Sequence, residues 1–121
     1  MSAINWFEIP VTDMDRAVKF YNAILGADLQ PMDTGSGSQM AMLPMEADGV
    51  GGALTKADGF SPGKDGPMVY LNGGADLNVI LNRVEGAGGQ VLVSKSSIGE
   101  FGFYALFTDS EGNWLGLHSM G

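Results

Sequence analysis

Two ionisable side chains, Glu8 and His118, are candidates for proton transfer to or from a ligand. Glu8 lies inside the apolar run from Trp6 to Val11, and a carboxylate buried there needs a hydrogen-bond partner or a proton. His118 is the only histidine, the residue type that ordinarily exchanges protons near neutral pH. Together they could act as acceptor, base or acid toward a ligand. Equally, Glu8 could be paired for structural reasons or exposed at a rim, and His118 could be solvated or bonded to backbone.

Three aromatic side chains could form a wall for a flat apolar ligand: Trp6, Tyr104 and Trp114. Ligand pockets are mostly apolar with a few polar anchors, which this set of residues would suit. The same aromatic types are also common in cores and in interfaces between chains. Both interpretations stay open at the level of sequence.

The composition excludes several kinds of chemistry. The 121 residues include no cysteine, so there are no disulfides, thiolate metal sites or cysteine nucleophiles. The formal net charge of −8 repels phosphate backbones and anionic lipids, and we therefore expect neither nucleic acid nor a membrane as a partner. No apolar run is long enough for a membrane span and no signal-peptide pattern is seen, which predicts a cytoplasmic protein.

The segments that position these residues repeat along the chain. Apolar residues recur at helical spacing from Asp13 to Gly26 and again, 63 residues later, from Asp76 to Gly89. Each segment is predicted to be an amphipathic helix, with the aspartate as its N-cap and glycine at its C-terminal end. The same shift places the acidic turn 46–49 on the turn 109–112, and Thr55 on His118.

One strand is predicted before each helix and three after it. The predicted strands span residues 5–11, 28–33, 39–45 and 51–56 in the first copy, and 68–72, 90–94, 102–108 and 113–119 in the second. Neighbouring side chains along a strand point to opposite faces, so Trp6 and Glu8 should share a cavity face. Trp114, Gly116 and His118 should share one too, with Leu115 and Leu117 turned toward the helices.

The order βαβββ, occurring twice, predicts an α+β domain. We expect the two modules, residues about 1–57 and about 68–121, to form one cupped, open, barrel-like mixed sheet with the helices outside. Residues about 57–67 are rich in Gly, Pro, Asp and Lys and are predicted to be an exposed linker. Each half alone would be marginally stable, so the whole chain, 1–121, is expected to fold as a single domain.

The runs from Trp6 to Tyr21 and from Phe103 to His118 resemble the glyoxalase, bleomycin-resistance and extradiol-dioxygenase proteins, called the vicinal oxygen chelate superfamily. The Trp-x-Glu of the first strand is most similar to the group related to lactoylglutathione lyase. This resemblance implies a ligand held in the cup between the modules, and a homodimer in which two copies complete or enclose their cups. In metal-dependent members, a His or Glu from the first and last strand of each module binds a divalent ion.

The resemblance places the four metal-ligand positions at Trp6, Ala53, Val69 and Gly116. None of these side chains offers a lone pair to a metal, whereas a catalytic divalent site needs about three or more N or O ligands. We therefore expect no metal and no cofactor.

These observations favour a metal-independent small-molecule binding protein, similar to drug-sequestering members of the superfamily. The residues predicted to line its ligand site are Trp6, Glu8, Thr55, Tyr104, Trp114 and His118. The alternative is a lyase, isomerase or dioxygenase-like enzyme in which Glu8 and His118 are the catalytic residues and transfer protons. A third possibility is an interaction module whose cup is filled by its own side chains.

Overall fold

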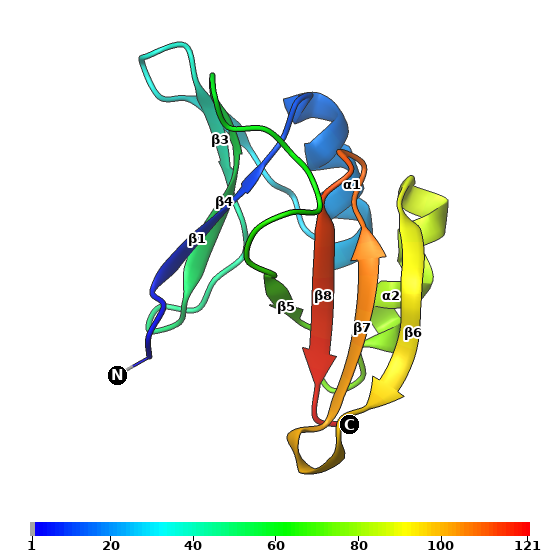
Figure 1. Cartoon of the computed structure of the whole chain (residues 1–121). Helices are drawn as coiled ribbons and strands as arrows, with labels where there is room; N and C mark the ends of the chain where they lie inside the picture. Colours follow the sequence, from blue (N-terminus) through cyan, green and yellow to red (C-terminus); the bar gives the residue numbers. More distant parts are fainter. Residues whose placement is uncertain (1) are drawn as a thin grey trace.

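The strands form two open sheets of four in the computed structural model, which describes residues 2–121 (Figure 1). The first sheet, in the order β1-β4-β3-β2, contains β1 (Trp6–Pro10), β2 (Pro31–Asp33), β3 (Gln39–Met42) and β4 (Gly51–Lys56). The second, in the order β5-β8-β7-β6, contains β5 (Tyr70–Asn72), β6 (Gln90–Ser97), β7 (Phe103–Thr108) and β8 (Trp114–Ser119). In each sheet the first two strands are parallel and the other pairs antiparallel. The α+β class and the βαβββ order are confirmed, with the strands divided between two sheets.

The first helix, α1 (Met14–Leu25), begins and ends as predicted. The side chain of Asp13 accepts a hydrogen bond from the Arg16 amide, and Gly26 ends the helix in the left-handed conformation, with φ 62°. The second helix, α2 (Asn78–Ala87), starts one residue later than Asp76 would allow as its N-cap. Leu77 holds that position and makes no side-chain capping bond, while the Asp76 carboxylate accepts hydrogen bonds from the Asn78 amide and the Lys95 ammonium. The prediction of Asp76 as the N-cap was therefore wrong.

Some strand boundaries differ from the predicted ones: β2 and β5 begin later than predicted, and β6 ends later. β5 has three residues and is followed by Gly73, whose amide bonds the His118 carbonyl at 2.7 Å. β2 also has only three residues. β6 runs three residues farther than predicted, to Ser97, because it stays paired with β7 through two irregular steps in register.

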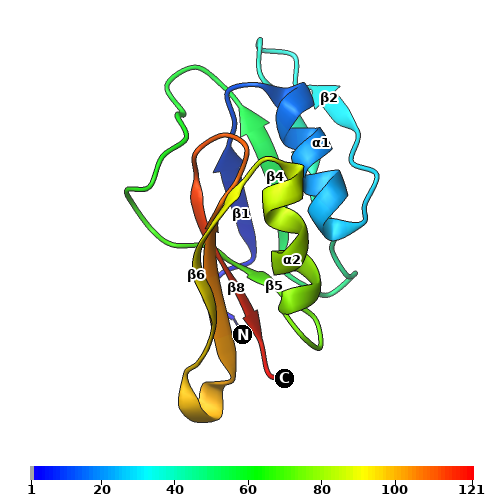
Figure 2. The same cartoon turned by 90° about the vertical axis from the view of Figure 1, so that its right-hand side faces the viewer.

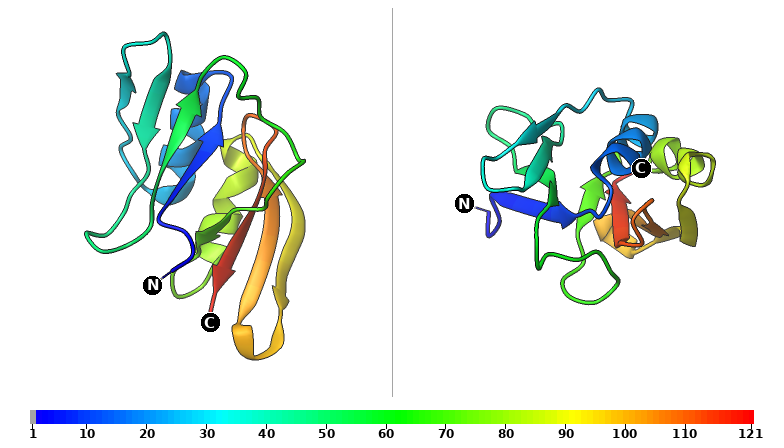
Figure 3. Two further views of the ribbon diagram at one scale, coloured as in Figure 1. Left: turned by 60° about the vertical axis from the view of Figure 1, so that its left-hand side comes forward. Right: turned by 90° about the horizontal axis from the view of Figure 1, so that it is seen from above.

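Both helices lie next to each other on one side of the sheets (Figures 2 and 3). Buried apolar side chains of both helices and both sheets form one core cluster. Phe20 of α1 stacks on Phe107 of β7 with ring centroids 6.4 Å apart. Leu115 and Leu117 of β8 are buried in the same cluster, as predicted. The core is shared by both modules, and the side of each sheet away from the helices is called here its open face. None of the helices described between residues 2 and 121 is long and apolar enough to cross a membrane.

One turn of the second module is bonded to the first module through Glu111. Its carboxylate accepts hydrogen bonds from the amides of Thr12 (2.9 Å) and Asp13 (2.8 Å) and makes a two-pronged ion pair with Arg16. Burial alone would raise the pKa of Glu111. The hydrogen bonds from Arg16, Asp13, Thr12 and Ser110 outweigh burial and lower that pKa to about 2.

Asp109, in the same turn, is buried and accepts hydrogen bonds from the Tyr21 hydroxyl (2.7 Å) and the Asn113 side-chain amide (2.9 Å). The amides of Glu111 and Asn113 also donate to it. Asn113 in turn donates to the carbonyl of Pro10 at 2.7 Å. We call Asp109, Glu111 and Asn113 the clasp, because they connect the end of β1 and the start of α1 to the second sheet.

Candidate functional site

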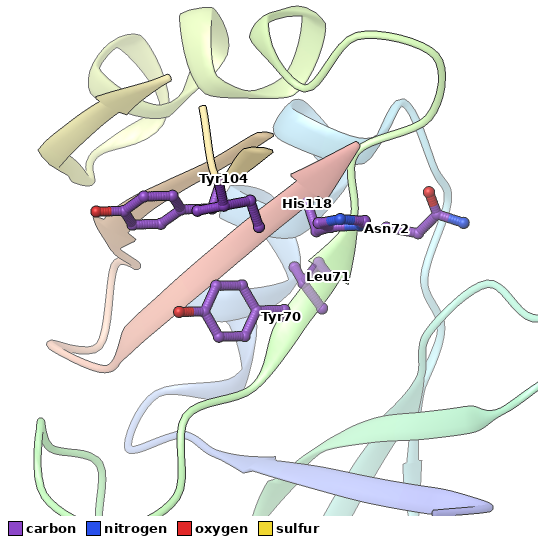
Figure 4. Close-up of a pocket in the computed structure, with 6 residues that line it drawn as sticks. Tyr70, Leu71, Asn72, Tyr104 and His118 are labelled. Atoms are coloured by element: carbon purple, nitrogen blue, oxygen red, sulfur yellow. The ribbon is translucent and has the colours of Figure 1, made fainter. Parts of the chain in front are cut away.

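A pocket of about 840 Å³ lies on the open face of the second sheet (Figure 4). It is lined by Tyr70, Leu71, Asn72, Ile98, Tyr104 and His118. Strand pairing places His118 between Asn72 on one side and Tyr104 on the other. In Figure 4 the hydroxyls of Tyr70 and Tyr104 point toward one end of the pocket, and Asn72 and His118 lie toward the other. The pocket thus combines two aromatic rings with hydrogen-bonding groups at both ends.

The ring of Tyr70 lies over Gly116 of β8, its partner in the strand register. A Cβ atom added to Gly116 would overlap this ring. Glycine therefore allows Tyr70 to pack closely on the sheet and to form part of the pocket floor. The exposed fraction of Tyr70 is still 50%, so its other face is available for contact.

The hairpin tip between β6 and β7 forms another wall of the pocket. It contains Ile98 and a short 3₁₀ helix, η1 (Gly99–Phe101). The ring Nε2 of His118 is 2.6 Å from the carbonyl oxygen of Phe101 and ties this tip to β8. One of the two sequence interpretations of His118 therefore holds, since the ring is bonded to backbone, and the residue also lines the pocket.

Trp6 and Glu8 share the open face of the first sheet, as their spacing predicts. The indole Nε1–H of Trp6 donates to Glu8 Oε2 at 3.1 Å, and both side chains are exposed. Of the sequence interpretations of Glu8, exposure holds in the single chain, because the helices cover only the other face of this sheet, where Phe7 and Ile9 pack. Glu8 lies on a different sheet from His118 and is not among the residues that line the pocket containing His118.

Thr55 also lies on the open face of the first sheet, in register with Pro10 and Met40. Its exposed fraction is 6%, and its Oγ1 has no hydrogen-bond partner within residues 2–121. The structure therefore separates Thr55 from His118, its counterpart in the repeat.

Trp114 is on the open face of the second sheet but outside the pocket lining. The ammonium of Lys64, from the linker, lies 5.9 Å from the centroid of its ring. The linker is held there by two hydrogen bonds between Gly63 and the segment Asn113–Trp114. The aromatic wall expected from Trp6, Tyr104 and Trp114 is thus not assembled within the chain, and only Tyr104 reaches the pocket.

Of the six residues predicted to bind a ligand, the structure brings Tyr104 and His118 together. The residues that sequence reasoning missed are Tyr70, Leu71, Asn72 and Ile98. The error at Tyr70 is a slip of one residue. Ala53 and Gly116 are 63 residues apart, whereas their strand partners Glu8 and Tyr70 are only 62 apart.

The sequence pattern that was missed lies in residues 69–74, which include β5 and the two glycines before α2. The side chain of Val69 packs toward the core and Leu71 is buried, so the residue between them must face the other way. Gly73 and Gly74 accommodate the extra residue before α2, and Gly74 has a positive φ of 73°. A strand with Val69 and Leu71 pointing inward would have predicted Tyr70 and Asn72 on the open face.

A family model described as Glyoxalase/Bleomycin resistance protein/Dioxygenase superfamily matches residues 3–117. The chain belongs to this superfamily. A curated relative of this chain is CFP32 of Mycobacterium tuberculosis, named as a candidate glyoxylase, with 28% identity over 117 residues. That match covers 93% of this chain and 44% of the relative, so the chain spans less than half of the relative's length.

Several solved structures share the fold. TnmS3, an antibiotic binding protein from Streptomyces sp. CB03234, is similar with a TM-score of 0.69 and 24% identity, over 100% of this chain and 98% of that one. The fosfomycin resistance protein FosX from Listeria monocytogenes has a TM-score of 0.66 and 14% identity, over 98% and 91% of the two chains. Glyoxalase I from Leishmania major has a TM-score of 0.67 and 21% identity, over 99% and 88%.

The side chains at the superfamily's metal positions do not fit a divalent ion. Trp6, Ala53 and Gly116 lie on the open faces and offer no lone pair to a metal. Val69 is turned toward the core, and the open-face position beside Gly116 belongs to Tyr70. Within residues 2–121 no three His, Cys, Asp or Glu side chains come together in a group that could hold a metal.

Proposed function

We propose that this chain is a metal-independent small-molecule binding protein whose ligand lies against the open face of the second sheet. The observation that carries the proposal is the pocket lined by Tyr70, Asn72, Tyr104 and His118, on the face where metal-dependent members hold their ion. Aromatic rings supply contact area, while the amide, imidazole and phenol groups supply orientation. The similar fold of TnmS3, named as an antibiotic binding protein, supports a binding function without requiring catalysis.

Binding of the uncharged fluorescent probe N-phenyl-1-naphthylamine tests the proposal directly. The wild-type protein should bind the probe with unchanged affinity after dialysis against EDTA. Tyr104→Ala should weaken binding about tenfold, because it removes one aromatic wall. Val79→Ala is the matched control, since Val79 is an exposed apolar residue on α2 outside the pocket lining. Equal binding by both variants, or a stoichiometric divalent ion retained through dialysis, would contradict the proposal.

A second copy of the chain is proposed to cover the pocket. The open face of the first sheet carries a group of residues called here the methionine face, which consists of Trp6, Glu8, Met32, Met40, Met42 and Met45. Met32, Met42 and Met45 have exposed fractions of 48%, 43% and 58%. An apolar face of this kind is costly in water unless it is covered. The methionine face of one copy over the pocket of the other would place Trp6, Glu8 and Thr55 near the ligand.

Sedimentation at micromolar concentration tests the homodimer. The wild-type protein should sediment as a dimer, and the double variant Met32→Glu/Met42→Glu as a monomer, because two charges would be buried in the interface. Val79→Glu places a charge on an exposed apolar position of α2 and should leave the dimer intact. A monomeric wild-type protein would contradict the dimer. Such a protein is proposed to act in the cytoplasm, without nucleic acid or membrane partners.

A further inference from the structure

The hydrogen bond of His118 determines which ring nitrogen carries the proton. A carbonyl oxygen can only accept a hydrogen bond, so the Nε2 atom 2.6 Å from the Phe101 carbonyl must be the donor. In the neutral ring the other nitrogen, Nδ1, then carries a lone pair and can only accept. Within residues 2–121 this is the single hydrogen bond of the ring. The side chain therefore offers a ligand an acceptor.

The backbone of the hairpin tip keeps Nε2 of His118 as the donor to the Phe101 carbonyl. The hairpin tip closes through hydrogen bonds from Ile98 to Gly102 and from Gly102 to Gly99. Gly102 has a φ of 97°, and a Cβ there would meet the carbonyl of Ser119, so the tip lies tightly against β8. The carbonyl of Phe101 is thereby held next to the ring, and His118 cannot easily exchange the roles of its two nitrogens.

No permanently positive side chain lines the pocket to balance a negative charge. Its lining residues contain no lysine or arginine, and the hairpin tip adds an acid, Glu100. The two lysines of the surroundings are engaged elsewhere: Lys95 bonds Asp76 and lies over the ring of Phe103, and Lys64 lies over Trp114. The net charge of −8 also opposes an anion. An anionic ligand would lose its hydration without gaining an ion pair to a lysine or an arginine.

We propose that the ligand is an uncharged aromatic molecule that donates a hydrogen bond from a hydroxyl or N–H group to His118 Nδ1. Its ring packs on Tyr70 and Tyr104, whose rings line the same pocket. Anionic phosphonates, carboxylates and thiolates are rejected. This inference rests on the proposed function, because it describes the ligand of the same pocket.

Three naphthalene probes that share one ring system test this preference by calorimetric titration at neutral pH. 2-Naphthol is uncharged and carries a donor, 2-methoxynaphthalene lacks the donor, and 2-naphthoate is an anion. The wild-type protein should bind 2-naphthol about 3- to 10-fold more tightly than 2-methoxynaphthalene, the usual net value of one hydrogen bond. It should bind 2-naphthoate at least about tenfold more weakly than 2-naphthol.

Two variants of His118 separate its two nitrogens. In His118→Gln, the amide N–H can still reach the Phe101 carbonyl, but the acceptor at the Nδ1 position is lost. This variant should bind 2-naphthol and 2-methoxynaphthalene equally. In His118→Asn, the side-chain oxygen replaces Nδ1 while the bond to Phe101 is lost. This variant should bind all probes more weakly but keep its preference for 2-naphthol.

The outcomes distinguish the inference from the proposed function. Binding of 2-naphthoate as tightly as 2-naphthol, or a preference for 2-naphthol that survives in His118→Gln, overturns the inference and leaves a small-molecule binding protein. Absence of binding of all three probes to the wild-type protein overturns both.

Discussion

The turns at residues 46–49 and 109–112 have the same pattern of residue types but very different surroundings. The first is exposed, and its described hydrogen bond runs from the Gly49 amide to the Glu46 carbonyl. The second contains Asp109 and Glu111, whose carboxylates are buried and bonded to the other module. Of these two turns, therefore, only the second is bonded to the other module. The other turn is left at the surface, on the module that carries the methionine face.

The two copies of the repeat differ in the helix side chains that are available to bond an acidic turn. Two side chains of α1 bond the clasp: Arg16 donates to Glu111, and Tyr21 donates to Asp109. Their counterparts 63 residues later, Val79 and Val84 of α2, have no polar group to offer. The clasp can thus form on one side only, and it sets the first sheet relative to the second, which carries the pocket.

Replacing Asp109 should lower the free energy of unfolding most strongly and so separate the two turns most clearly. Asp109→Ala would leave the Tyr21 hydroxyl buried without an acceptor, and the Asn113 side-chain amide would lose one of its two acceptors. Each such group costs about 1–3 kcal/mol, so we expect the free energy of unfolding to fall by about 3 kcal/mol or more. Glu46→Ala, the counterpart in the exposed turn, should change it by less than about 0.5 kcal/mol. Urea unfolding of both variants measures the difference, and similar losses would show that the clasp has no special role.

Acid should weaken the clasp through Glu111. Its pKa is about 2 in the folded protein and 4.5 without these contacts, so its ionised form stabilises the fold fully above pH 4.5. That contribution, about 2 kcal/mol once solvent screening of the ion pair with the half-exposed Arg16 is allowed for, is lost as the pH falls from about 4.5 through about 2. Unfolding free energies measured across this range should show the decrease in the wild-type protein and a smaller one in Glu111→Gln. An equal pH dependence in both proteins would rule out this origin.

Removing one hydroxyl should have a smaller effect. Tyr21→Phe deletes the bond to Asp109 and is expected to lower the free energy of unfolding by about 1–2 kcal/mol. Burial next to Asp109 raises the pKa of Tyr21, so the neutral phenol contributes stability that is lost only as the pH rises above the ordinary value of about 10. Alkaline unfolding should therefore separate the wild-type protein from Tyr21→Phe. Coincident alkaline curves would contradict this role.

Local pattern was sufficient to predict the helices and the order of the strands. Apolar spacing and the glycine at position 26 specify α1 through contacts within a few residues, and the same holds for most of α2. The face of a strand is less secure, because a slip of one residue moves every side chain to the opposite side. At Gly73–Gly74 such a slip occurs, and it assigned to Val69 the metal-ligand position that Tyr70 occupies in the structure.

Burial and long-range pairing could not be predicted in the same way. The sequence around Glu8 indicates a strand, but it does not indicate that helices cover only one face of that strand. Arg16 and Glu111 are 95 residues apart, and nothing in the two acidic turns indicates which of them will be bonded. The sequence did predict Tyr104 and His118 on one face, because alternation within long, regular strands is reliable.

The smallest effect on stability is expected at Gly116, where the two modules differ by a single methyl group. Its counterpart Ala53 already has a Cβ, whereas a Cβ at Gly116 would push the Tyr70 ring off the sheet. Because Tyr70 is half exposed and can move outward, Gly116→Ala should change the free energy of unfolding by less than about 0.5 kcal/mol. Binding of 2-naphthol should nevertheless weaken about 3- to 10-fold, as an aromatic contact is lost. Ala53→Gly is the matched change in the first sheet. It should leave binding of 2-naphthol unchanged when it is made in the Met32→Glu/Met42→Glu variant, which is expected to be monomeric and so to lack a partner's first sheet over the pocket. Equal losses in Gly116→Ala and Ala53→Gly would place the ligand away from Tyr70.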